Sequence, residues 1–205
     1  TLEPTPSVPG YTFIGWETED VTLSTGKFMM PTHDVTLKGR FVENAAVEIR
    51  YVPDNAEHGS TTNSPDMVSP VSGTPKGSIA TAETGYAFKN WTKDGVVVSW
   101  NAELKPEDIA KVGGLYVASG YVANFGVDDN GDQIPDEYQT IFYYISADEK
   151  KGTVSVAEEV HTFRDEDGNY TEKTAISPNG AIATPLDGFA FDYWTDSEVN
   201  DYTPD

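Results

Sequence analysis

The chain has 205 residues, 38% of them hydrophobic and 12% aromatic, and its 34 acidic and 13 basic side chains give a net charge of −21. This composition predicts packed cores rather than a disordered tail, and the negative field excludes nucleic-acid binding because it repels phosphate backbones. The lack of cysteine excludes disulfides and thiolate-bound metals, and no apolar run is long enough to span a bilayer, so we expect no membrane insertion within this segment.

The first predicted strand covers residues 10–16 and reads Gly-Tyr-Thr-Phe-Ile-Gly-Trp. The opening glycine suits a turn that needs a positive φ. Tyr11 and Phe13 lie two residues apart, so their side chains point to the same face of the strand. Trp16 lies three residues beyond Phe13 and points to the other face unless a β-bulge shifts the alternation. A closing strand for this segment is predicted over residues 35–41.

The strongest pattern in the chain is an internal repeat. Residues 77–92 and 180–195 are identical at nine of sixteen positions without a gap. Their shared element is glycine, an aromatic residue, any residue, Phe, two further residues and Trp, and residues 10–16 carry a third copy of it. The period of two within this element predicts a core strand, with Phe13, Phe88 and Phe191 buried at equivalent places.

Residues 105–113 of the second copy predict a short helix. Pro106 lies in the first turn, acidic residues follow it, and Gly113 comes at the end. Residues 115–125 then predict the closing strand of this copy. The predicted fold class is therefore mainly β (α+β), with at most short helices.

An acidic loop follows the second copy. Oxygen-bearing side chains stand at loop positions 1, 3, 5 and 9, a spacing that resembles the calcium loops of EF-hands, dockerins and thrombospondin type-3 repeats. Calcium binds roughly six to eight oxygen ligands, and alternate residues of a tight loop point their side chains inward. The candidate calcium ligands are the side chains of Asp128, Asn130, Asp132 and Asp136 and the backbone carbonyl of Ile134.

Two residues depart from the calcium-loop pattern. Gln133 stands where the sharp turn normally has glycine, and neutral Gln139 stands where a bidentate glutamate is usual. Calcium is therefore expected to bind only weakly, with a Kd of about 10⁻⁴–10⁻³ M. The alternative is a metal-free acidic turn held by Asx hydrogen bonds.

The third copy contains an insertion. Its opening strand, residues 140–144, follows the equivalent residues 47–51 at an offset of 93, whereas the offset further downstream is 103. The difference, 103 minus 93, places ten extra residues within the segment 160–174. Two alternating segments flank Asp167-Gly168 there, so we predict a hairpin with this dipeptide at its exposed tip.

These patterns predict three consecutive units. Residues 1–43 form a partial first repeat unit, residues 44–126 form the second, and residues 127–205 form the acidic linker loop and a truncated third unit with the hairpin insertion. The first unit lacks an opening strand and the third lacks a closing strand, so we expect the chain to come from a longer array.

One composite pattern resembles a known family. Residues 10–16, followed by residues 28–37 with their Met-Pro-x-x-Asp-Val-Thr-Leu entry, resemble the Listeria–Bacteroides repeat found in internalin B-repeats. The second and third units are similar to longer relatives in Gram-positive surface proteins. The resemblance implies small tandem β-grasp-like units, export, and a stalk or adhesive role without catalysis.

The expected function is that of a non-catalytic stalk or adhesive module in a secreted bacterial cell-surface protein. Such a protein is extracellular and attached to the cell wall or surface through regions outside this chain. Its partner is then a host or cell-surface protein or a glycan, and the sequence identifies neither the partner nor the ligand-binding residues.

Two alternatives stay open. The chain is either a glycan- or protein-ligand-binding module that uses exposed aromatic residues such as Trp100 or Tyr202, or an accessory region of a surface-anchored enzyme. An exposed Trp100 favours glycan binding, and a buried one favours a stalk. A catalytic role within this chain is not expected, because the sequence has no nucleophile elbow or phosphate loop and its histidines, His33, His58 and His161, are scattered.

Overall fold

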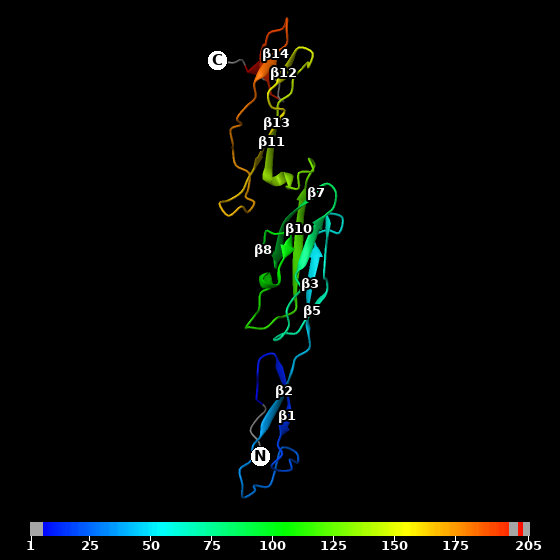
Figure 1. Ribbon diagram of the computed structural model, residues 1–205, viewed down its shortest axis with the longest axis vertical. Helices are drawn as coiled ribbons and strands as arrows, with labels where there is room; N and C mark the ends of the chain where they lie inside the picture. The colour runs from blue at the N-terminus through cyan, green and yellow to red at the C-terminus, as the bar shows by residue number, and fades with distance from the viewer. Residues whose placement is uncertain (1–5, 197–200, 203–205) are drawn as a thin grey trace. The chain divides into compact units, whose positions relative to one another are not determined.

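Figure 1 shows the computed structural model, which describes residues 6–196 and 201–202. Strands dominate these residues, and the helical segments among them are two 3₁₀ turns, Pro106–Asp108 and Asp136–Tyr138. The prediction of a mainly β fold is confirmed. No helix in the described part is long and apolar enough to cross a membrane. The chain divides into two compact units, 1–126 and 127–205, and the predicted further division after residue 43 stays a prediction.

The first repeat is an antiparallel pair of strands, β1 (Tyr11–Glu17) and β2 (Lys38–Glu43). The register shifts between Phe13 and Gly15, where Gly15 takes a φ of +146° that residues with a Cβ rarely adopt. This bulge lets Trp16 meet Phe13 edge-to-face, with ring centroids 5.3 Å apart. The shift in alternation needed for a shared Phe–Trp core is therefore present.

The second repeat is built on a five-stranded sheet with the order β5-β3-β10-β7-β8 (Figure 1). Its β3 and β10 run parallel to each other, whereas β3–β5 and β7–β8 are antiparallel. A smaller sheet has the order β4-β6-β9. The strands are β3 (Val47–Pro53), β4 (Gly59–Thr61), β5 (Asp66–Val68), β6 (Ser78–Ala82), β7 (Tyr86–Lys93), β8 (Val96–Ser99), β9 (Glu103–Leu104) and β10 (Ser119–Val127).

The core of the second repeat lies around Trp91. Its side chain is fully buried, and its indole N–H donates a 3.1 Å hydrogen bond to the carbonyl of Ala102. Tyr51 and Tyr121, from the two parallel strands, are buried as well, and Tyr51 meets Trp91 edge-to-face at 6.3 Å. The indole N–H is the only polar group of this side chain. Because it has a hydrogen-bond partner, Trp91 can be buried without leaving an unpaired donor.

The prediction that Phe13, Phe88 and Phe191 are buried is wrong in degree, because all three are half-buried. In the second repeat Trp91 occupies the centre of the core, and Phe88 packs beside it against Phe125, with ring centroids 6.0 Å apart. In the first and third repeats the described strands form only two-stranded sheets, which cover less of each Phe side chain.

The helix predicted over residues 105–113 is a single 3₁₀ turn, Pro106–Asp108. Proline begins the turn as expected, but the chain is already extended at Ile109, with φ −84° and ψ 103°. Gly113 and Gly114 then both take positive φ. These two glycines form a tight turn in which Val112 and Leu115 exchange backbone hydrogen bonds of 2.9 and 3.1 Å. The predicted helix is therefore too long, because the residues after the 3₁₀ turn are extended or belong to this second turn.

The third repeat consists of paired strands. The pairs are antiparallel: β11 with β13, β12 with β14, and β15 with β16. The 3₁₀ turn at Asp136–Tyr138 leads directly into β11. The strands are β11 (Gln139–Tyr143), β12 (Gly152–Val154), β13 (Glu158–Thr162), β14 (Ala183–Pro185), β15 (Trp194–Thr195) and β16 (Asp201–Tyr202).

The insertion in the third repeat forms an exposed turn. Arg164 and Tyr170 make an isolated antiparallel bridge, and the Gly168 between them takes a φ of +84°. The Asp165 carboxylate accepts backbone hydrogen bonds from Asp167 at 3.0 Å and from Asn169 at 2.8 Å. The turn lies at the predicted dipeptide, but its arms pair through this single bridge instead of two full strands.

Candidate functional site

The acidic loop folds around the carboxylate of Asp128. Its Oδ1 accepts the backbone N–H groups of Gly131 at 2.8 Å and Asp132 at 3.1 Å, and its Oδ2 accepts that of Gln133 at 2.9 Å. Gly131 and Gln133 both have positive φ, +73° and +68°, which turns successive amides toward one point. Asp128 is only 5% exposed, so these hydrogen bonds replace the water that its charge loses.

A second carboxylate, that of Asp132, ties the loop to the start of β11. Its Oδ2 accepts the side-chain amides of Gln139 at 2.6 Å and Asn130 at 3.2 Å, and its Oδ1 accepts the Ile134 N–H at 2.9 Å. Burial by itself raises the pKa of Asp132, but the hydrogen bonds from Gln139, Ile134 and Asn130 hold that pKa below its ordinary value. The neutral Gln139, which is 2% exposed, therefore serves as an internal partner of the loop.

The structure brings some of the predicted calcium ligands together. Asp128, Asn130 and Asp132 share one hydrogen-bond network, whereas Asp136 accepts the Asp129 N–H at 3.2 Å. Among the described residues, no group of three or more acidic or histidine side chains is arranged to hold a metal ion. The carboxylate oxygens already accept amides of the loop, so an ion would have to compete with those hydrogen bonds. Calcium binding therefore stays a prediction.

The departure at Gln133 does not prevent a sharp turn. Gln133 takes the left-handed conformation at a cost of roughly 1 kcal/mol relative to glycine. Its N–H bond to Asp128 offsets part of that cost. The backbone of a tight acidic loop is thus formed without the usual glycine.

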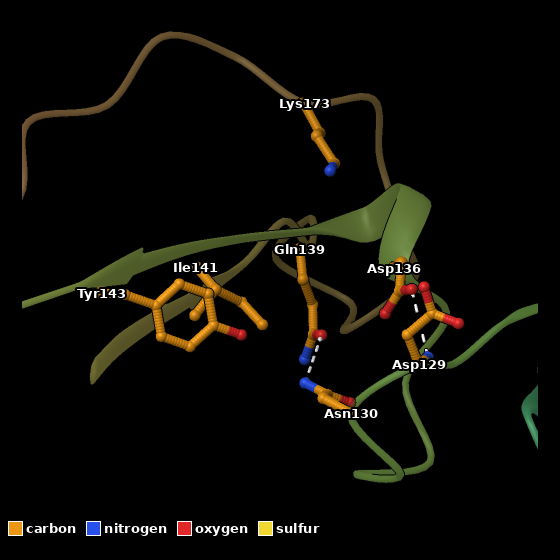
Figure 2. Close-up of a pocket in the computed structure, with 7 residues that line it drawn as sticks. All are labelled: Asp129, Asn130, Asp136, Gln139, Ile141, Tyr143 and Lys173. Atoms are coloured by element: carbon orange, nitrogen blue, oxygen red, sulfur yellow. Dashed lines mark hydrogen bonds between the residues drawn. The ribbon is translucent and has the colours of Figure 1, made fainter. Parts of the chain in front are cut away.

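A shallow hollow of about 340 Å³ lies beside the loop (Figure 2). Figure 2 shows Asn130 and Gln139 joined by a hydrogen bond at its base, with Lys173 approaching from the opposite side. Two carboxylates and one ammonium group stand among the lining residues, and no nucleophile lies next to a base in this lining. The lining residues are Asp129, Asn130, Asp136, Gln139, Ile141, Tyr143 and Lys173.

A second constellation links a tyrosine, a carboxylate and a turn, and it occurs twice. In the second repeat, Asp66 Oδ2 accepts the hydroxyl of Tyr51 at 3.5 Å and the N–H of Lys76 at 2.7 Å. In the third, Glu159 Oε2 accepts the hydroxyl of Tyr144 at 3.1 Å and the N–H of Asn179 at 2.9 Å. We call this arrangement the tyrosine–carboxylate lock.

The lock changes the pKa values of its tyrosine and carboxyl groups. Burial, and then the charge of Asp66, raise the pKa of Tyr51 well above its ordinary value. The pKa of Glu159 is lowered to about 2, chiefly by the hydrogen bond from the N–H of Asn179. The side chain of His161 also lowers this pKa, whereas burial raises it. The lock escapes sequence comparison because its carboxylates differ in residue type. The signal that could have found it is the common offset of 93 that relates both of its tyrosines and both of its carboxylates.

A third carboxylate joins the first repeat to the second. Glu43, at the end of β2, accepts the N–H groups of Val71 at 2.7 Å and Ser72 at 2.9 Å and the Ser72 hydroxyl at 2.6 Å. The Ser72 side chain and these amides lower the pKa of Glu43. Gly10 lies against Val71 and Leu115, and a Cβ on Gly10 would come within 2.3 Å of Val71 Cγ2. This contact is called the Glu43 joint.

The aromatic residues considered for ligand binding give no clear platform. Trp100 is half-buried and engaged with a neighbour, so it meets neither the exposed nor the buried expectation. The side-chain environment of Tyr202 lies outside the described residues. His58 stacks on Tyr86 with ring centroids 4.4 Å apart, and His161 bonds Glu159, so both of these histidines contribute to packing.

The comparisons with known proteins agree with the repeat pattern. Residues 1–45 and 52–107 match the family described as the divergent InlB B-repeat domain. The match spans the first repeat and continues through the second to its 3₁₀ turn. No curated protein and no solved structure matches the chain.

Proposed function

We propose that this chain, whose residues 1–45 and 52–107 match the divergent InlB B-repeat domain family, is a non-catalytic repeat region of a secreted bacterial surface protein. Its role is that of a stalk or adhesive module, which spaces and displays other parts of the protein. The family match supports a repeat module of a surface protein, and the separate aromatic contacts of the repeats support the spacing role.

The observation that carries this proposal is an aromatic pair repeated along the chain. Each repeat holds its own Phe and Trp in ring contact, three residues apart in sequence. Separate small cores in series allow each module to hold its shape without one large shared core, which suits an extended array. The pairs are Phe13–Trp16, Phe88–Trp91 and Phe191–Trp194, with ring centroids 5.3, 6.2 and 5.6 Å apart.

The Glu43 joint supports the same role. A linker that only connected two repeats would need no fixed contacts. Glu43 instead accepts two backbone amides and one hydroxyl from the second repeat. Charge-assisted hydrogen bonds of this kind are directional and restrict bending, so the joint favours transmission of force and position along the array.

A display experiment tests the proposal. One or two copies of the chain are placed between a bacterial surface anchor and a reporter domain, and reporter capture by antibody-coated beads is measured. A Gly/Ser linker of equal residue number is the control, because it behaves as a flexible coil. We expect capture to rise from one copy to two and to exceed that of the control.

The opposite result favours the binding alternative. If capture does not depend on copy number, and the isolated chain binds a glycan array in a manner lost on Trp100→Ala, the chain is a ligand-binding module. The half-burial of Trp100 gives that alternative no support at present.

A further inference from the structure

The third repeat contains counterparts of six strands of the second. The equivalent strand pairs have the same partners once the offsets of 93 and 103 are applied. Ile49 pairs with Asp66 and Phe142 with Glu159, and Trp91 pairs with Ser99 and Trp194 with Tyr202. The corresponding strands are β11 and β3, β12 and β4, β13 and β5, β14 and β6, β15 and β7, and β16 and β8.

The two equivalent strands β3 and β11 differ in what lies along their edges. In the second repeat, β3 pairs with β5 on one edge and with the parallel β10 on the other. In the third repeat, β11 pairs with β13 on the equivalent edge, and no other described strand pairs with it. The described part of the third repeat therefore has no counterpart of β10, the strand that joins β3 to β7.

Aromatic residues of the third repeat are less buried than their counterparts in the second, as expected where no central strand is present among the described residues. Ile49 and Tyr51 on β3 are 0% and 1% exposed, whereas the equivalent Phe142 and Tyr144 are only half-buried. Trp91 is 0% exposed, and the equivalent Trp194 is half-buried. The strand that carries Trp91 has eight residues, against two for β15. Within the described residues, the aromatic side chains of the third repeat are thus less covered than their counterparts in the second.

We propose that the free edge of β11 is an acceptor site for one further strand, a closing strand with the residue pattern of β10, which inserts parallel to β11 between it and β15. The second repeat gives the register. Ser119, Gly120 and Tyr121 of β10 stand opposite Ile49, Arg50 and Tyr51. At the offset of 93, the same strand stands opposite residues 142–144.

The chemistry of β10 defines the occupant. Tyr121, Ala123 and Phe125 alternate inward and are 0%, 0% and 5% exposed, so the site selects an aromatic, a small and a second aromatic residue at every other position. Residues 119–127 contain no charged side chain. A neutral strand enters an acidic molecule without electrostatic repulsion, whereas two whole chains of charge −21 repel each other. The occupant is therefore a closing strand of this repeat type, not a second copy of the chain.

A synthetic peptide with the sequence of residues 117–127 tests the site on the 205-residue chain. Amide hydrogen exchange is followed by mass spectrometry with increasing peptide. We expect exchange at residues 140–146 to slow by about tenfold or more at saturation, because an added strand protects the free edge. Residues 47–53 provide an internal control, since both edges of β3 are already paired.

Two variant peptides separate strand insertion from general adhesion. Ala123→Asp places a charge at an inward position and should abolish the protection. Val122→Thr changes the neighbouring, half-exposed position and should preserve it. Absence of slowing at millimolar peptide, equal slowing with Ala123→Asp, or slowing at residues 47–53 would each overturn the proposal. Protection at residues 140–146 that rises with chain concentration in the absence of peptide would also overturn it, because a second copy would then occupy the edge.

Discussion

At the scale of single residues, the fully buried Trp91 is the main determinant of the second repeat's core. Its ring contacts those of Tyr51 and Phe88, and its only polar atom donates to a backbone carbonyl. Phe88 is half-buried and lies beside this centre. The two aromatic residues of one motif therefore contribute unequally to stability.

Truncating these two residues should give different losses of stability. Trp91→Ala removes a side chain with no exposed surface and should lower the free energy of unfolding by about 3–5 kcal/mol. Phe88→Ala should cost less, because part of that ring already contacts water. Urea unfolding of both variants, followed by circular dichroism, measures the difference. Equal losses would place the centre of the core elsewhere.

A second residue-scale prediction concerns acid stability at Glu159. Its pKa is lowered from 4.5 to about 2 in the folded protein, chiefly by the N–H of Asn179. A lowered folded-state pKa adds stability above the unfolded pKa and loses it as the pH falls through the folded value. Glu159→Gln should therefore be less stable than the wild type at neutral pH, and this difference should shrink between pH 4.5 and about 2.

The neighbouring Glu158 is the matched control, because it is exposed on the same strand. Glu158→Gln should change stability little over this pH range. Thermal melts from pH 2 to pH 7 provide the measurement. A stability difference for Glu159→Gln that does not depend on pH would mean that the charge of Glu159 is not what stabilises the lock.

At the scale of elements, the acidic loop shows how a local pattern can be satisfied in two ways. The carboxylates of Asp128 and Asp132 accept six hydrogen bonds. Four come from backbone amides of the loop, and two come from the side-chain amides of Asn130 and Gln139. The same oxygens are the predicted calcium ligands. Calcium binding and the internal hydrogen bonds of the loop therefore compete for the same carboxylate oxygens.

Calcium titration decides between them. If calcium binds, calorimetry should give a Kd of about 10⁻⁴–10⁻³ M and the melting temperature should rise at millimolar calcium. Asp132→Ala should remove both effects. Asp129→Asn is the control, because it changes an adjacent charge that is not a predicted ligand. No heat and no change in melting temperature for the wild type would leave a metal-free turn.

Elements that depend on local alternation could be predicted from the sequence, and those that depend on distant partners could not. The β1 bulge follows from the spacing of Phe13 and Trp16. The helix predicted over residues 105–113 is too long, because the chain is extended at Ile109, whose side chain is buried in the core. Gly113 then belongs to a tight turn instead of ending a helix. In the candidate site, the Asx hydrogen bonds of the loop belong to the metal-free alternative that the sequence leaves open, and calcium binding stays a prediction. The hydrogen bond between Asp132 and Gln139 depends on the fold and could not be predicted.

At the scale of the whole molecule, the Glu43 joint fixes the first repeat against the second. Its three hydrogen bonds connect the end of β2 with the segment at Val71 and Ser72. Gly10 is tightly packed against Val71, one of the residues of the same contact. The joint is a place where one substitution should change the coupling between repeats without disrupting the core of either.

Glu43→Ala should let the first repeat move independently of the second. Nitrogen-15 relaxation should then give different tumbling times for β1–β2 and for the five-stranded sheet, which should be similar in the wild type. Glu48→Ala is the control, because Glu48 pairs with Arg50 within the second repeat. Unchanged relaxation in Glu43→Ala would show that other contacts carry the joint.

The tyrosine–carboxylate lock has a consequence for how such arrays diverge. The same role is filled by the shorter Asp66 in one repeat and the longer Glu159 in the next. The geometry thus tolerates one extra methylene as long as an acid faces the tyrosine and the turn amide. Mutational drift can therefore exchange the two acids and erase identity at this position while the bond survives. Each turn amide is followed by a glycine with positive φ, Gly77 or Gly180. Distant copies of the module should be easier to detect by the co-occurrence of the tyrosine, the acid and this glycine than by letter-by-letter similarity.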